Sequence, residues 1–156
     1  MTPANVPVYL SCVQPEVVFV DCKAMVKEFY EQVASNNRVD EVERYVHPDC
    51  TLRSGEENIP IGLEGMRQHL VDVRKTYPDF RIRVLRQHQD GDFVISEVIL
   101  EGTHGGEWLG IRPTGKKIRI TAVNIDRIAG GRIIEHGGAA NTFDTFWAEG
   151  LIRAAE

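Results

Sequence analysis

The sequence of 156 residues has no CxxC pair, no run of lysines and arginines, and no long uninterrupted apolar stretch. Its three cysteines, Cys12, Cys22 and Cys50, are an odd number without ligand spacing, so we expect neither a disulfide framework nor a metal site. The net charge of -5 disfavours nucleic acid as a partner, because binding it needs a basic surface. The composition, with 42% hydrophobic residues, fits one globular domain with a substantial core.

The segment 1–25 contains short apolar runs, which Pro7 and Pro15 interrupt. These runs are far shorter than the roughly 20 residues that a membrane span needs. No basic residue precedes them, unlike the start of a secretory signal. We therefore expect a cytoplasmic protein without a membrane partner, in which residues 16–20 form a short strand or an arm.

The first half of the chain is predicted to be mainly helical. Apolar residues recur at helical spacing over residues 26–33, 39–46 and 63–77. Pro78 ends the third of these helices, because the residue before a proline is pushed away from helical geometry. A short strand is predicted around residues 50–53.

From residue 79 onward the apolar period changes to two, which indicates strands. We predict strands over residues 80–84, 92–101, 116–128 and 132–141, with glycine-containing turns between them. Helices followed by hairpin-linked strands predict an α+β fold, in which an antiparallel sheet carries helices on one face.

The predicted strand over residues 116–128 contains the most informative pattern. Because side chains alternate between faces, one face collects Ile118, Ile120, Ala122, Asn124, Asp126 and Ile128. A buried carboxylate without a partner raises its pKa and can move protons near neutral pH, so Asp126 is a candidate general acid/base. Asp126 is equally well interpreted as a buried acid that simply accepts hydrogen bonds.

The next predicted strand places Glu135 and His136 side by side in the sequence. In a regular strand they face opposite ways, so only one of them faces the interior. Gly137 and Gly138 permit a bulge that would change which one does. His136 is a candidate acid/base group because its pKa lies near neutrality, although a lone histidine in a strand is more often structural.

Three segments resemble the SnoaL-like polyketide cyclase family of the nuclear-transport-factor-like superfamily. They are YPDFRIRV at residues 77–84, GTHGGEWLGIRPTGKKIRI at 102–120 and GGRIIEH at 130–136. The resemblance implies a cone with an internal apolar pocket, formed by a strongly curved antiparallel sheet wrapped around N-terminal helices. It also implies a single domain: an N-terminal arm at residues 1–23, the cone at 24–144 and a C-terminal helix at 145–156.

Family cyclases close a ring by intramolecular aldol chemistry, without a metal or cofactor. An acidic residue near the end of the last strand is their general acid/base, and a histidine on the preceding strand helps it. In this sequence Asn141 matches the acid and Asp126 matches the histidine, while Gly137 replaces a tryptophan. We therefore assign Asp126, Asn141 and His136 as catalytic candidates, with the amides of Asn141 and Asn124 orienting the substrate carbonyl.

Four residues are candidates for substrate binding: Tyr30, Asn124, His104 and Trp108. Tyr30 matches a pocket tyrosine of similar cyclases, or is a core aromatic whose hydroxyl reaches the surface. His104 and Trp108 lie in the glycine-rich connection, which forms either a lid over the pocket or a rigid turn.

Two hypotheses about function follow. The first is a cofactor-independent cyclase or isomerase of secondary metabolism, acting on a small polycyclic or polyketide-like substrate with Asp126 as general acid/base. The second is a non-catalytic protein that binds a small apolar organic ligand in the same pocket, which Asn141 in the acid's position favours. The resemblance also implies a homodimer.

Overall fold

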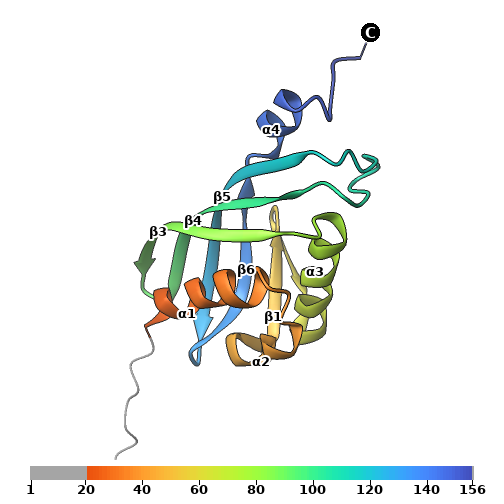
Figure 1. Cartoon of the computed structure of the whole chain (residues 1–156). Coiled ribbons are helices and arrows are strands. Elements are labelled where there is room, and N and C mark those ends of the chain that lie inside the picture. The colour runs from red at the N-terminus through yellow and green to blue at the C-terminus, as the bar shows by residue number, and fades with distance from the viewer. Residues whose placement is uncertain (1–20, 156) are drawn as a thin grey trace, which may run out of the picture.

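The computed structural model describes residues 21–155, and the predicted strand or arm at residues 16–20 lies outside them. In chain order the elements are α1 (Cys22–Glu28), η1 (Phe29–Ala34), η2 (Val39–Glu41), α2 (Val42–Tyr45), β1 (Val46–Ser54), β2 (Glu57–Pro60), α3 (Gly62–Thr76), β3 (Arg81–Asp90), β4 (Phe93–Thr103), β5 (Lys117–Ala129), β6 (Arg132–Ala140) and α4 (Thr142–Ala148). The predicted helices and strands are present, and the fold is α+β (Figure 1).

The first helical segment joins α1 to the π-helical turn η1. Its start is fixed by Asp21, whose carboxylate accepts a hydrogen bond of 3.1 Å from the Ala24 amide. One face of the segment is apolar and buried, including Val26, Phe29 and Val33. This burial holds the helix against the sheet and carries Tyr30 into the interior.

The sheet has six strands in the order β2-β1-β6-β5-β4-β3. It is mixed, because β1 pairs in parallel with β6 while the other neighbours are antiparallel. The prediction of a wholly antiparallel sheet is therefore wrong. An apolar period of two identifies a strand but carries no information about its neighbour, and β1 takes a partner far along the chain.

The expectation of a strongly curved sheet that closes into a cone is also wrong. The sheet is not strongly curled, and α1, η1, α2 and α3 form a helical layer against it (Figure 1). The cavity that forms the candidate site therefore lies between the helical layer and the sheet.

One element was not predicted, and several element boundaries differ from the sequence prediction. The strands β1 (Val46–Ser54) and β3 (Arg81–Asp90) are both longer than the predicted 50–53 and 80–84. The edge strand β2 was not predicted, because its residues are exposed and show no apolar alternation. The C-terminal helix α4 begins at Thr142 and ends at Ala148, whereas residues 145–156 were predicted.

The core lies between the layers and includes the fully buried residues Val26, Val46, Val94 and Ile133. Among residues 21–155, no helix has the length and apolar character needed to cross a membrane.

Candidate functional site

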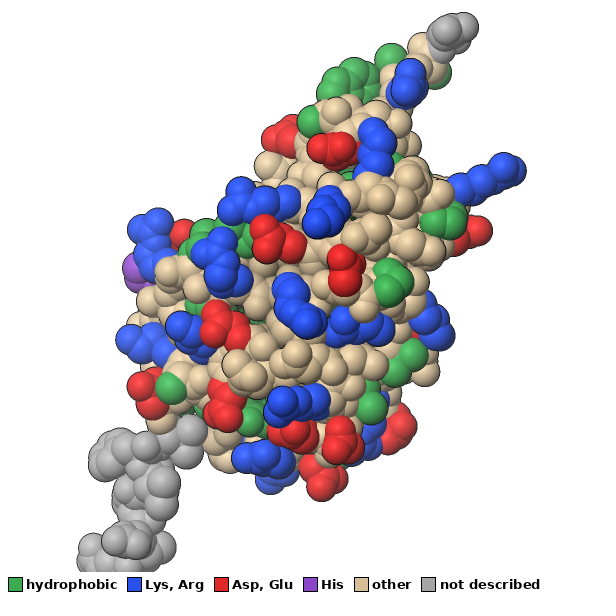
Figure 2. Space-filling model, viewed as in Figure 1, with side chains coloured by type: hydrophobic (Ala, Val, Ile, Leu, Met, Phe, Trp, Pro, Cys, Tyr) green, Lys and Arg blue, Asp and Glu red, His purple; other side chains and the backbone are tan. Residues whose placement is uncertain are grey.

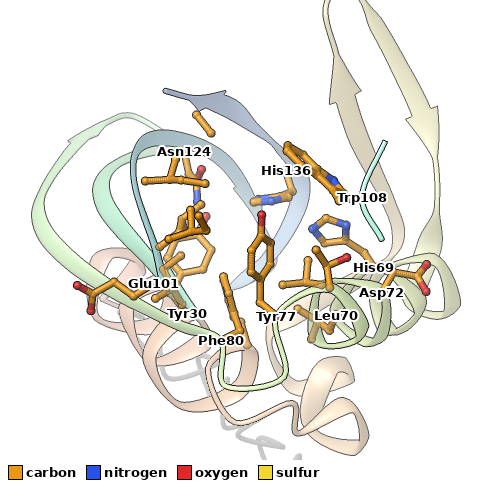
Figure 3. A pocket seen from close by; sticks show the side chains of 18 of the residues that line it. Tyr30, His69, Leu70, Asp72, Tyr77, Phe80, Glu101, Trp108, Asn124 and His136 are labelled. Atoms are coloured by element: carbon orange, nitrogen blue, oxygen red, sulfur yellow. The ribbon is translucent and has the colours of Figure 1, made fainter. Parts of the chain in front are cut away.

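A cavity of about 370 Å³ lies between the helices and the inner face of the sheet. This volume falls within the range of pockets for small organic ligands. The wall is mostly apolar and includes Phe29, Met66, Leu70, Val73, Phe80, Ile82, Leu100, Ile118 and Ile120. Polar side chains enter it at a few points, among them Asn124, His136 and His69 (Figure 3).

Asp126 lies on the buried face of β5, as the alternation predicted, and its side chain is fully buried. One carboxylate oxygen accepts a hydrogen bond from the Tyr30 hydroxyl. The other accepts one of 2.8 Å from Nδ1 of His136. Asp126 is therefore a satisfied buried acid, and it does not itself line the cavity.

His136 lies directly opposite Asp126 in the register of β5 and β6 and lines the cavity. A carboxylate can only accept, so the proton of a neutral His136 ring is on Nδ1. Nε2 then carries the lone pair, and it has no hydrogen-bond partner among the residues that the structure describes. The arrangement is a buried carboxylate that orients an imidazole toward an apolar cavity.

Glu135 faces away from this pair and interacts with Arg53 and Arg127, each at 3.7 Å. The pairing of β5 with β6 contains a bulge, and this bulge determines which residue of β6 lies opposite Asp126. Ala129 pairs with Arg132 and Ile128 with Ile133, whereas Arg127 pairs with Glu135, so Ile134 is an extra residue. Without this bulge, Asp126 would lie opposite Glu135 instead of His136.

The two glycines of β6 do not form the bulge that the sequence suggested, because pairing is regular through Gly137 and Gly138. They permit close packing instead. A Cβ on Gly137 would lie 2.8 Å from the Arg53 Cβ, and one on Gly138 would overlap with the Val123 carbonyl oxygen. A Gly138 Cβ would also lie 2.8 Å from Oδ1 of Asn124, so the glycine makes room for that amide.

Asn141 is not brought to the cavity. It follows His136 by five residues in a regular stretch, which places its side chain on the opposite face of the sheet. It is exposed at the start of α4, and its amide donates a 3.0 Å hydrogen bond to Asp144. The structure therefore separates Asn141 from Asp126 and His136.

Tyr30 is a buried residue whose side chain lines the cavity. Burial, and then the adjacent charge of Asp126, raise the pKa of its hydroxyl well above 10, while a hydrogen bond from Asn124 partly offsets the rise. Tyr30 therefore keeps its proton and donates it to Asp126 as a hydrogen bond. Asn124 lines the cavity beside it.

The glycine-rich connection after β4 is anchored at its base. The amides of Gly105 and Gly106 both donate to the Thr76 carbonyl at the end of α3, at 2.9 and 3.0 Å. His104 is buried behind the cavity wall and does not line the cavity; its Nδ1 is 3.2 Å from the Thr114 hydroxyl. Trp108 does line the cavity.

Trp108 also makes an edge-to-face contact with Phe146 of α4, with 5.0 Å between ring centroids. This contact joins the connection to the C-terminal helix at one end of the cavity. The two readings of the connection therefore apply to different parts: an anchored base around His104, and a wall provided by Trp108.

Two further residues at the cavity were not predicted as site residues. His69 of α3 lines the cavity, and its ring centroid is 6.3 Å from that of His136. It follows Met66 by three positions, so helical spacing could have placed it beside the apolar stripe. Tyr77 also lines the cavity, and its hydroxyl points toward the His136 imidazole in Figure 3. Partial burial raises the pKa of Tyr77.

Within residues 21–155, no three His, Cys, Asp or Glu side chains are grouped so that they could hold a metal ion. On the face seen in Figure 2, lysines and arginines are interspersed with acidic side chains. The cavity is thus the feature of the described chain that combines enclosure with oriented titratable groups.

Comparison with known proteins finds a matching family and a related protein of known name. The model of a family described as SnoaL-like polyketide cyclase matches residues 24–146. A Streptomyces nogalater protein, nogalonic acid methyl ester cyclase, is 31% identical over 107 residues, which are 65% of this chain and 78% of that protein.

Two solved structures share the fold. One is a proposed polyketide cyclase from Acidithiobacillus ferrooxidans, with a TM-score of 0.74 at 19% identity, covering 84% of this chain and 95% of that one. The other is IdmH, a proposed polyketide cyclase from Streptomyces antibioticus, with a TM-score of 0.70 at 22% identity over 83% and 99% of the two chains. At these identities the two structures establish similarity of fold alone.

Proposed function

The chain belongs to the SnoaL-like polyketide cyclase family, and from this membership we propose that it is a cofactor-independent enzyme of acid/base chemistry. Its substrate is a small polycyclic or polyketide-like molecule, and the reaction is ring closure or a related isomerisation. His136 is the general base and acid, and Asp126 orients it.

The observation that carries this proposal is the 2.8 Å hydrogen bond between Asp126 and His136 at the wall of an apolar cavity. The carboxylate holds the proton on Nδ1, which leaves the Nε2 lone pair free to accept a proton from a ligand. It also stabilises the imidazolium that then forms. General acid/base groups positioned in this way contribute roughly 10²–10⁴-fold to a rate.

This assignment differs from the sequence hypothesis, in which Asp126 itself was the base. Asp126 is fully buried, and both of its oxygens already accept hydrogen bonds, from Tyr30 and His136. A substrate carbon has no direct access to it. Asp126 therefore acts through His136, and Asn124 is the amide that can orient a substrate oxygen at the cavity wall.

The proposed reaction needs no co-reactant. Nε2 of His136 removes a proton from a carbon next to a carbonyl group, and the C–H electron pair becomes the C=C bond of an enolate. The enolate carbon attacks a second carbonyl carbon of the same molecule and forms the new C–C bond. The resulting alkoxide takes the proton back from His136.

The apolar wall supports an apolar, ring-containing substrate. The Streptomyces nogalater relative is, by its name, a cyclase of nogalonic acid methyl ester. This compound is therefore the first probe to use, together with a panel of polycyclic ketones that carry an acidic C–H next to a carbonyl.

The test follows the exchange of carbon-bound hydrogen in D₂O by mass spectrometry, and ring closure by chromatography. We expect the wild-type protein to incorporate deuterium into at least one probe, and His136→Gln to lose this activity while still binding the probe. Exchange that persists at the wild-type rate in His136→Gln would overturn the assignment of the base.

A non-catalytic ligand-binding protein remains the second candidate. It is favoured by Asn141, which occupies the position of the family's acid and lies away from the cavity. Saturable binding of the probes by the wild-type protein, without deuterium exchange or ring closure, would support this candidate over the enzyme.

The homodimer implied by family resemblance also stays a proposal. The outer face of the sheet exposes Leu85, Phe93, Val123 and Ile125, and aromatic or aliphatic residues of this kind are common at dimer interfaces. Sedimentation of the wild-type protein and of Ile125→Lys would test it. We expect the variant to dissociate to a monomer.

A further inference from the structure

His69 approaches the cavity from α3, the side opposite the strand that carries His136. The two imidazole rings have centroids 6.3 Å apart and are inclined by 53° (Figure 3). Among residues 21–155, the His69 ring takes part in no hydrogen bond. Unlike the hydroxyl of Tyr30, which donates to Asp126, this imidazole is held by no neighbour among residues 21–155 and stays available to a ligand.

The spacing of the rings suits a shared ligand group. Hydrogen bonds from imidazole nitrogen to oxygen are about 2.9 Å long. A ligand oxygen held by one ring at that distance brings the adjacent carbon within reach of the other ring.

We propose that His69 is a second catalytic residue, a neutral N–H donor that binds the substrate's carbonyl oxygen while His136 removes the proton from the neighbouring carbon. This inference rests on the proposed function, and it specifies the substrate as a ketone whose oxygen and acidic C–H lie on adjacent atoms.

The surroundings of His69 favour the neutral form that this role requires. His69 is an exposed residue whose side chain lines the cavity. Desolvation by the surrounding protein, and then the facing His136, lower the pKa of His69, while the nearby Asp72 of the same helix opposes the shift. Tyr77, whose hydroxyl points toward His136 in Figure 3, keeps its proton because its pKa is raised.

A neutral imidazole is suited to an enolate. When the C–H bond breaks, its electron pair moves into the new C=C bond, and the carbonyl π pair moves onto oxygen. The proton goes to Nε2 of His136, and the hydrogen bond from His69 strengthens as the oxygen gains charge. An oriented donor of this kind is worth about 10²–10³-fold in kcat.

The test compares His69→Leu, which removes the donor, with His69→Gln, which keeps an N–H donor but cannot titrate. We expect His69→Leu to lower kcat for deuterium exchange by about 10²-fold with little change in KM. We expect His69→Gln to recover most of that loss. The matched control is His88→Leu, an exposed histidine of β3 outside the cavity, which should keep wild-type kinetics.

A second readout does not depend on turnover. Binding of a phenol probe that mimics the enolate should weaken more in His69→Leu than binding of the parent ketone. Urea denaturation of each variant establishes that it is folded.

The outcomes separate this inference from the proposed function. Wild-type kcat in a folded His69→Leu, together with loss of exchange in His136→Gln, would overturn the role of His69 and leave the base assignment in place. The absence of exchange in the wild-type protein with every probe would overturn both.

Discussion

Asp126 and His136 occupy directly opposite positions on the antiparallel strands β5 and β6, and their side chains are joined by a 2.8 Å hydrogen bond. Side chains at opposite positions of a strand pair lie on the same face of the sheet. The pair is therefore positioned by the backbone ladder and needs no loop closure to form. Tyr30 completes the arrangement from the helical layer by donating to the second carboxylate oxygen.

Asp126→Asn should reduce kcat by about 10²–10⁴-fold, because an amide can donate to Nδ1 and shift the ring proton to Nε2. The imidazole would then present no lone pair to the substrate. The measurement is the rate of deuterium exchange or ring closure with nogalonic acid methyl ester, combined with the affinity for the same compound, which we expect to change little.

The control for removal of this charge is Asp90→Asn at the exposed end of β3. It should leave kcat unchanged. If the Asp126 and Asp90 variants had equal kcat, the carboxylate would have no catalytic role.

Tyr30→Phe should destabilise the protein, because the variant leaves one oxygen of a fully buried carboxylate without its donor. Hydrogen bonds to charged groups contribute about 1.5–3 kcal/mol, and we expect a loss in that range. Urea denaturation monitored by tryptophan fluorescence measures it. The matched control is Tyr45→Phe, whose hydroxyl interacts with the exposed Glu28 and should cost less than about 1 kcal/mol. Equal losses in the two variants would contradict a special role for the Tyr30 bond.

The sequence predicted the buried position of Asp126, because the alternation in residues 116–128 is regular and that face is apolar. It also predicted that only one of Glu135 and His136 faces inward. It could not predict which of them meets Asp126. The tight Gly130–Gly131 turn alone would pair Asp126 with Glu135, and the extra residue Ile134 moves the register by one.

The position of that bulge depends on packing between strands, which no local pattern records. The same limit explains why His69 was not predicted as a site residue. Its place on the wall depends on how α3 sits against the sheet. Asn141 was predicted at the site but does not line the cavity. A family motif placed it at the site, but regular pairing from Gly137 to Ala140 turns its side chain to the other face.

Stability should fall as the pH rises above about 10, and Tyr30 should contribute to the fall. The pKa of Tyr30 is raised in the folded protein. Above the ordinary tyrosine pKa the unfolded chain therefore loses this proton while the folded protein keeps it. The folded state then binds more protons, so its stability decreases with pH, by up to about 1.4 kcal/mol per pH unit for one group.

Tyr45 and Tyr77 have raised pKa values as well, so the comparison that matters is between wild type and Tyr30→Phe. Urea denaturation at a series of alkaline pH values should give a shallower decline for the variant. Parallel declines would mean that Tyr30 ionises with an ordinary pKa in the folded protein.

Gly106→Ala should displace the connection that carries Trp108 and weaken ligand binding. A Cβ on Gly106 would overlap with the Lys75 carbonyl oxygen, a backbone atom that cannot rotate away, whereas one on the adjacent Gly105 would lie 3.1 Å from the Pro78 Cδ. Overpacking of this kind costs about 1–3 kcal/mol.

The displaced Gly106 backbone should break the two hydrogen bonds to Thr76 and draw Trp108 away from Phe146. We therefore expect weaker probe binding and altered tryptophan fluorescence in Gly106→Ala, with smaller effects in Gly105→Ala. Equal affinity in both variants and the wild type would mean that Trp108 does not help to hold the ligand.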